Sequence, residues 1–95
     1  MGSRRAVRLT FYTKEDCRLC DDAKLLLQSL QGSFSIEVDE VDIASKEHLE
    51  RRFGEVVPVV KIEGGPSLFG KIDGDRLRQA VSLAAVAGGS DRGPI

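Results

Sequence analysis

The sequence predicts an α/β fold whose strands and helices follow the order βαβαββα. Apolar side chains alternate with period two in several short segments and recur at helical spacing in others, and glycine or proline residues separate many of these segments. The opening strand–helix–strand unit favours parallel strands joined by a right-handed crossover, and the closing hairpin favours antiparallel pairing. The expected architecture is therefore a mixed four-stranded sheet with three flanking helices.

The first half of the chain predicts two strands and one long helix. Alternating apolar and polar residues over 6–12 indicate a strand. Over residues 17–31 the apolar side chains share one helical face, and Gly32 is expected to stop this helix by adopting the left-handed conformation. Alternation resumes over 34–38. Because Val41 has the opposite parity, a β-bulge or the end of the strand is expected there.

The second half predicts a short helix, a hairpin and a last helix. These elements are expected over residues 45–54, 56–62, 67–69 and 73–88. Ser45 is suited to cap the short helix, and Gly54 is suited to end it. The third strand is mostly β-branched, which favours extended backbone. Asp73 or Asp75 is expected to open the last helix, and Gly88 to stop it.

Length and charge predict one domain with no nucleic-acid surface. A chain of 95 residues supports one core, which we place in residues 6–88, with flexible termini at 1–5 and 89–95. Fourteen Lys and Arg against fifteen Asp and Glu give a formal charge of −1, which argues against nucleic acid as a partner. No apolar run reaches the roughly 18 residues of a membrane span. The N-terminus lacks a signal-peptide pattern, so we expect the protein to stay in the cytoplasm. We also expect it to be a monomer.

Cys17 and Cys20 form a Cys-x-x-Cys motif that follows a predicted strand and opens a predicted helix. The free N–H groups of a helix N-terminus favour a thiolate at Cys17, and the thiolate is the nucleophilic form. Cys20, one turn later, can attack a mixed disulfide formed at Cys17. Half a zinc site and an inert structural pair are the alternatives. A zinc site needs about four ligands and His48 is the only histidine, so we expect redox chemistry and no metal.

Pro58 interrupts an otherwise strong strand pattern over residues 56–60. Because proline donates no hydrogen bond to a ladder, it belongs at an edge, a strand start or a bulge. Two interpretations are open. Pro58 is either a trans proline at an ordinary strand start, or part of a cis Val57–Pro58 bond placed opposite the cysteines. The cis bond would leave nearby backbone groups free to pair with an extended substrate.

These motifs together resemble the glutaredoxin branch of the thioredoxin superfamily. The resemblance covers about residues 7–87 and rests on Phe11-Tyr12-Thr13-Lys14, Cys17-x-x-Cys20, Val57-Pro58, Gly70 and Asp73. The Cys-x-Leu-Cys-Asp stretch that begins at Cys17 is most similar to small glutaredoxin-like proteins. The resemblance implies a thioredoxin fold and a thiol–disulfide oxidoreductase acting on protein or mixed disulfides. It further implies that Cys17 attacks, that Cys20 resolves and that Pro58 is cis.

The resemblance also implies a substrate site and a reductant. In the family's pattern glutathione lies against positions that correspond to Lys14, Val57, Pro58 and Asp73, and Arg18 is a further cation in reach. Several positions depart from that pattern, including a valine in place of threonine before Val57. We therefore expect no bound cofactor, weak glutathione binding, and regeneration by a reductase or by glutathione. A non-catalytic thioredoxin-fold module that binds a partner or a metal is the alternative.

Overall fold

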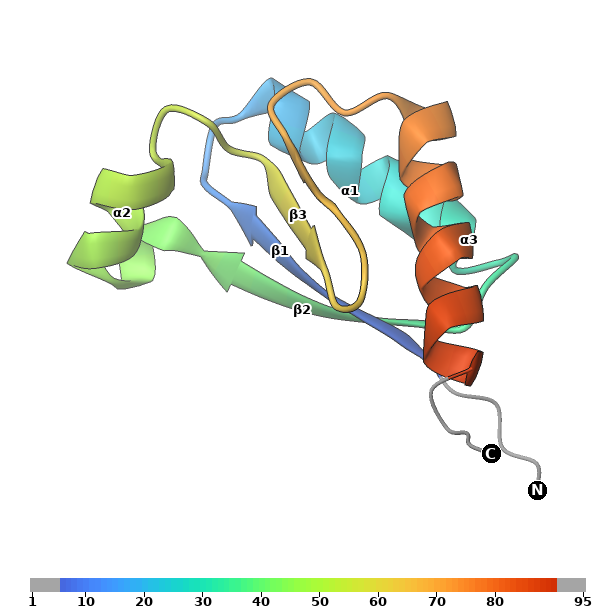
Figure 1. Ribbon diagram of the computed structural model, residues 1–95. Coiled ribbons are helices and arrows are strands. Elements are labelled where there is room, and N and C mark those ends of the chain that lie inside the picture. The colour runs from blue at the N-terminus through green and yellow to red at the C-terminus, as the bar shows by residue number, and fades with distance from the viewer. Residues whose placement is uncertain (1–5, 91–95) are drawn as a thin grey trace.

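The computed structural model describes residues 6–90 and contains four strands and three α-helices (Figure 1). The elements are β1 (Val7–Thr13), α1 (Arg18–Leu30), β2 (Ile36–Asp42), the 3-10 helix η1 (Ile43–Ser45), α2 (Glu47–Phe53), β3 (Val59–Ile62), β4 (Ser67–Phe69) and α3 (Gly74–Ser90). This order confirms the βαβαββα prediction and adds one short 3-10 turn. Of the termini expected to be flexible, 1–5 and 91–95 lie outside the described residues.

The four strands form one mixed sheet in the order β2-β1-β3-β4. β1 pairs with β2 in parallel, and β3 is antiparallel to both β1 and β4. The predicted bulge in the second strand is wrong, because β2 pairs with β1 residue by residue from Ile36 to Asp42. Val41 pairs with Tyr12, whose neighbour Phe11 belongs to the core on the other face. The apolar side chains near the end of β2 therefore lie on the face of the sheet opposite the core, which is why they no longer follow the alternation of the earlier residues.

The hydrophobic core fills the space between the sheet and two helices. Figure 1 shows α1 and α3 together on one face of the sheet. The buried residues of the core come from β1, α1, β3 and α3: Val7, Leu9, Phe11, Ala23, Leu27, Leu30, Val60, Ile62, Leu77, Ala80, Val81 and Ala84. Because β1 and β3 alternate with period two, every second side chain of these strands reaches this core. The core fixes β1, and therefore the point at which the cysteine motif begins.

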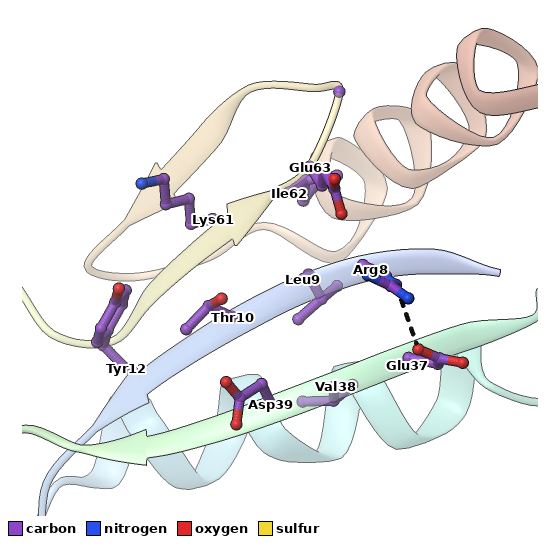
Figure 2. A pocket seen from close by; sticks show the side chains of 11 residues that line it. Arg8, Leu9, Thr10, Tyr12, Glu37, Val38, Asp39, Lys61, Ile62 and Glu63 are labelled. Atoms are coloured by element: carbon purple, nitrogen blue, oxygen red, sulfur yellow. Dashed lines mark ion pairs between the residues drawn. The ribbon is translucent and has the colours of Figure 1, made fainter. Parts of the chain in front are cut away.

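The opposite face of the sheet is lined by charged and polar side chains (Figure 2). Arg8 and Glu37 form an exposed ion pair of 3.5 Å across β1 and β2. A shallow hollow of about 690 Å³ lies here, with Asp39 and Lys61 among the residues that line it. α2 lies beyond the end of the sheet, at the left of Figure 1. Neither cysteine lines this hollow, so the Cys-x-x-Cys motif lies outside it.

The start of one strand, near Pro58, and the end of one helix, near Gly32, differ from the prediction. β3 begins at Val59 rather than at residue 56, because proline cannot donate to the ladder. α1 ends at Leu30, and Gln31 keeps a right-handed φ of −64°. The only positive-φ glycines among residues 6–90 are elsewhere, so the left-handed stop predicted at Gly32 is wrong. The turn is closed instead by Phe34, whose N–H donates to the Leu30 carbonyl at 2.9 Å.

The predicted ends of the other helices also need correction. Ser45 does not cap α2. Its hydroxyl donates to the Asp42 carbonyl at 2.7 Å, and Lys46 precedes the helix without a side-chain cap. α3 continues through Gly88 to Ser90, since a glycine near a helix end lowers helix stability by only about 1 kcal/mol. None of the helices within residues 6–90 combines the length and apolar character that crossing a membrane requires.

Candidate active site

Cys17 and Cys20 lie at the start of α1 and are joined as a disulfide, with their Cα atoms 5.1 Å apart. Cys17 is the N-cap of the helix, with extended backbone angles of φ −121° and ψ 105°. Its Sγ accepts a hydrogen bond from the Cys20 N–H at 3.1 Å. A sulfur therefore occupies the place where a capping oxygen usually satisfies the free N–H groups of a helix.

A tight turn sets the direction from which Cys17 enters the helix. Asp16, directly before it, has a left-handed φ of 55° and is the only non-glycine residue with positive φ in the described part of the chain. Aspartate is among the residues that tolerate this conformation. The Asp21 N–H then donates to the Cys17 carbonyl at 3.0 Å, which closes the first helical turn.

The two sulfur-bearing residues differ in their access to solvent. Cys20 is only 1% exposed and belongs to a second buried cluster with Ile43 and Val57. Cys17 is partly buried and packs against this cluster from outside. A reagent in solution can therefore approach the disulfide at Cys17, while Cys20 is covered by protein.

The segment from Val56 to Pro58 brings the second predicted motif to the cysteines. Val57 is in the same buried cluster as Cys20, and Pro58 is buried. The Val57–Pro58 peptide bond is cis. The N–H groups of Val56 and Val57 both donate to the Phe53 carbonyl at 3.0 Å. The backbone groups beside Pro58 were expected to be free to pair with a substrate. For the two N–H groups this is wrong, because both donate to the carbonyl of the last residue of α2.

The other predicted binding residues are distributed around this centre. Lys14 donates from Nζ to the Gly54 carbonyl at 3.2 Å, so its ammonium group holds the end of α2. Arg18 is the exposed first residue of α1. The Asp73 carboxylate accepts the Asp75 N–H at 3.2 Å at the start of α3. It also borders a separate hollow of about 380 Å³ that contains neither cysteine.

Three further residues support the site through contacts that the sequence did not predict. Phe53 stacks on Tyr12 with ring centroids 4.6 Å apart, and both pack against the cluster around Cys20. The Gly70 N–H donates to the Val56 carbonyl at 3.1 Å and to the Pro58 carbonyl at 2.9 Å. A glycine next to the end of a strand was a usable signal for Gly70, but nothing in the sequence pairs Tyr12 with Phe53.

Gly70→Ala is expected to lower the free energy of unfolding by about 1–2 kcal/mol, because the φ of Gly70 is 68° and L-residues disfavour that region. An added Cβ would meet no atom within 4 Å, so the cost is conformational. Urea denaturation followed by circular dichroism measures it. Gly32→Ala, where no positive φ is required, is the matched control. Equal stability of the two variants would contradict the prediction.

Within residues 6–90 no group of three or more His, Cys, Asp or Glu side chains is arranged to hold a metal ion. The site presents two sulfur atoms at the N-terminal end of a helix, one on a partly exposed residue and one on a buried residue.

Comparisons with known proteins agree with this geometry. The glutaredoxin-like domain family (DUF836) matches residues 8–82. A structural-genomics target protein from X. campestris is 30% identical, with a TM-score of 0.63 over 90% of this chain and 99% of the other. A thioredoxin variant from Halobacterium salinarum has a TM-score of 0.69 at 19% identity, over 83% of this chain and 74% of that one, which is a likeness of fold. No curated protein matches the sequence significantly. The chain belongs to the glutaredoxin-like domain family, and its fold is that of thioredoxin-like proteins.

Proposed function

We propose that this protein is a thiol–disulfide oxidoreductase that reduces disulfides in proteins or mixed disulfides. The observation that carries the proposal is the contrast within one sulfur pair: Cys17 caps a helix and is partly exposed, whereas Cys20 is only 1% exposed. A structural disulfide has no need of this asymmetry, and a bridge across so short a loop stabilises a fold little.

In the proposed reaction the protein starts as the dithiol. The Cys17 thiolate, favoured by the helix N-terminus and the Cys20 N–H, attacks one sulfur of the substrate disulfide. An S–S bond forms between Cys17 and the substrate, and the other substrate sulfur leaves as a thiolate and takes a proton. Cys20, after losing its proton, then attacks the Cys17 sulfur. The second substrate sulfur is released as a thiol, and the Cys17–Cys20 disulfide remains.

Two electrons and two protons have then passed to the substrate, and a thiol reductant must return them. A reductase with its own dithiol or two molecules of glutathione are the classes able to do so. No bound cofactor is required, because the two sulfurs carry the electrons themselves. We place the reaction in the cytoplasm, where thiols are kept reduced, and in a monomer, since both sulfurs come from one chain.

Catalysed reduction of a protein disulfide such as that of insulin, with a dithiol as the electron source, tests the proposal. We expect multiple turnovers on the protein disulfide. For a glutathionylated peptide we expect a kcat/KM about 30-fold lower than for the protein disulfide, because about two polar contacts to glutathione are missing. Lys14 is engaged by Gly54, and Val57 has no free N–H. A folded protein that reduces neither substrate would be a non-catalytic module. Preference for the glutathionylated peptide would identify glutathione as its natural partner.

A further inference from the structure

The two edges of the sheet differ in how well they are protected. β4, at one edge, has three residues and is flanked by Pro66 and Gly70. β2, at the other edge, has seven residues, pairs with β1 in continuous register and contains neither proline nor glycine. Proteins usually shorten or interrupt an edge strand, because its unpaired N–H and C=O groups attract other strands. The free edge of β2 is therefore a surface on which a further strand can pair.

The backbone groups of Val38 and Glu40 point outward from this edge. The Val7 N–H donates to the Ser35 carbonyl at 2.8 Å, so the backbone of Ser35 faces β1. Because backbone groups along a strand point alternately to its two sides, those of Val38 and Glu40 point away from β1. Within residues 6–90 they have no hydrogen-bond partner on that side.

The two ends of this edge are closed by side chains of the same chain. The Ile36 carbonyl accepts a hydrogen bond from Gln31 Nε2 at 3.4 Å. The Asp42 carbonyl accepts the Ser45 hydroxyl at 2.7 Å. The open stretch lies between these positions, and its length suits one added strand of about five residues.

Side chains of an added strand would alternate between two hollows that flank β2. On the helix side a hollow of about 140 Å³ lies between β2 and α1, with Phe11, Leu27 and Val38 as its apolar lining. Since a cavity of about 150 Å³ holds a benzene molecule, this hollow fits one apolar side chain. On the other face lies the hollow of about 690 Å³ that Glu37 and Asp39 border (Figure 2).

Charge determines which strand can pair with this edge. Four of the seven residues of β2 carry carboxylates: Glu37, Asp39, Glu40 and Asp42. Antiparallel pairing of two copies about residue 38, 39 or 40 would set Glu37 against Asp39, Asp39 against Asp39, or Glu40 against Glu40. Like charges directly opposite one another are destabilising, so a second copy is disfavoured. Asp39 takes part in none of the ion pairs among the described side chains, so it is available to a basic side chain of another protein.

We propose that β2 binds an extended segment of a partner protein, which joins the sheet as a fifth strand through the outward groups of Val38 and Glu40. An apolar side chain of the segment enters the hollow beside Leu27, and a Lys or Arg on its other face lies beside Asp39. The backbone hydrogen bonds supply affinity, and the alternating side chains supply specificity. Neither cysteine lines the two hollows, so this docking site does not depend on the proposed redox activity.

A synthetic peptide of about nine residues, in which lysine and valine alternate, is the probe. Its Kd for the intact protein is measured first by calorimetry, and absence of binding at about 1 mM would overturn the proposal. At about ten times Kd, amide exchange at Val38 and Glu40 is expected to slow about tenfold, because about one-tenth of the chains remain free. The N–H groups of Val57 and Gly70, beside the disulfide, are the internal control. Slower exchange at these two and not on β2 would also overturn the proposal.

A pair of variants at one position tests the backbone contact. Glu40→Pro and Glu40→Gln both remove the exposed ion pair with Lys24, but only the proline also removes an outward N–H. The proline variant is expected to bind the peptide about fivefold more weakly than the glutamine variant, and equal affinity would contradict the proposal. N-methylation of alternate peptide amides is expected to weaken binding to the unmodified protein to a similar extent, and this readout does not depend on how well Glu40→Pro folds.

Side-chain changes test the kind of partner. Replacing the central valine of the peptide by serine is expected to weaken binding about tenfold, because less apolar surface is buried. Asp39→Asn is expected to reduce the preference for lysine over glutamate peptides. Glu63→Gln, on the same face but on the far side of β1, is the matched control and is expected to retain it. Equal loss in both variants would contradict the role of Asp39. A dimer of the free protein, with Val38 and Glu40 protected without peptide, would assign the edge to a second copy and overturn the proposal.

Discussion

Cys17→Ser is expected to abolish disulfide reduction, whereas Cys20→Ser is expected to stop the reaction at a mixed disulfide on Cys17. Cys17 is the sulfur that solvent reaches, and Cys20 is 1% exposed. Without Cys17 no accessible thiolate remains at the helix N-terminus. Without Cys20 the first exchange still occurs, but the sulfur that would release the substrate is absent.

Mass spectrometry of the two variants after incubation with a substrate disulfide distinguishes the roles. We expect one substrate adduct per chain on Cys20→Ser and none on Cys17→Ser. The variants are matched controls for each other, because both lack the Cys17–Cys20 disulfide and each keeps one thiol. A stable adduct on Cys20 of Cys17→Ser would reverse the assignment of the attacking and resolving residues.

Phe11→Ala is expected to cost about 3–5 kcal/mol of unfolding free energy, which is a large part of the roughly 5–15 kcal/mol typical of a domain. Phe11 is 1% exposed and lies on β1, the strand bonded to both β2 and β3. Removing its ring leaves a cavity that neighbours on α1 and α3 cannot fill without moving. Urea denaturation followed by circular dichroism suits a chain that contains no tryptophan.

Phe69→Ala removes the same ring from a 56% exposed position on β4 and is the matched control. Its cost is expected to stay below about 1 kcal/mol, because little apolar area is removed from contact with protein. A loss at Phe11 as small as that expected at Phe69 would show that the core does not depend on the ring of Phe11. A larger loss at Phe69 would mean that the exposed side of β4 is covered in solution.

Periodicity predicted the parts of the fold that depend on burial on one side. Leu9 and Phe11 on β1 and Leu27 on α1 lie on the expected faces, and all three are in the core. The second strand was harder to predict, because an argument from parity assumes that one face is covered along the whole strand. β2 continues to Asp42, and the partly buried Val41 lies on the other face.

The centre of the site was predictable, and its surroundings were not. The positions of Cys17 and Cys20 could be predicted because the motif is defined by residue types: two cysteines, three positions apart, directly after a strand pattern and at the start of a helix pattern. The partners of Lys14 and of the Val57 N–H are backbone carbonyls. Every residue has a carbonyl, so no residue type in the sequence marks those two. Their position depends on where α2 ends, which only the folded chain defines.

The small size of α2 has a consequence for the hydrogen bonds that its end makes beside the disulfide. The helix has seven residues and none of them is fully buried, so opening it costs less free energy than unfolding the sheet. Each opening releases the Lys14 ammonium and the Val57 N–H together, because Gly54 and Phe53 move with the helix end. The closed and open forms thus have different recognition properties. In the oxidoreductase that we propose, the hydrogen-bond donors offered to a substrate therefore depend on whether this short helix is folded.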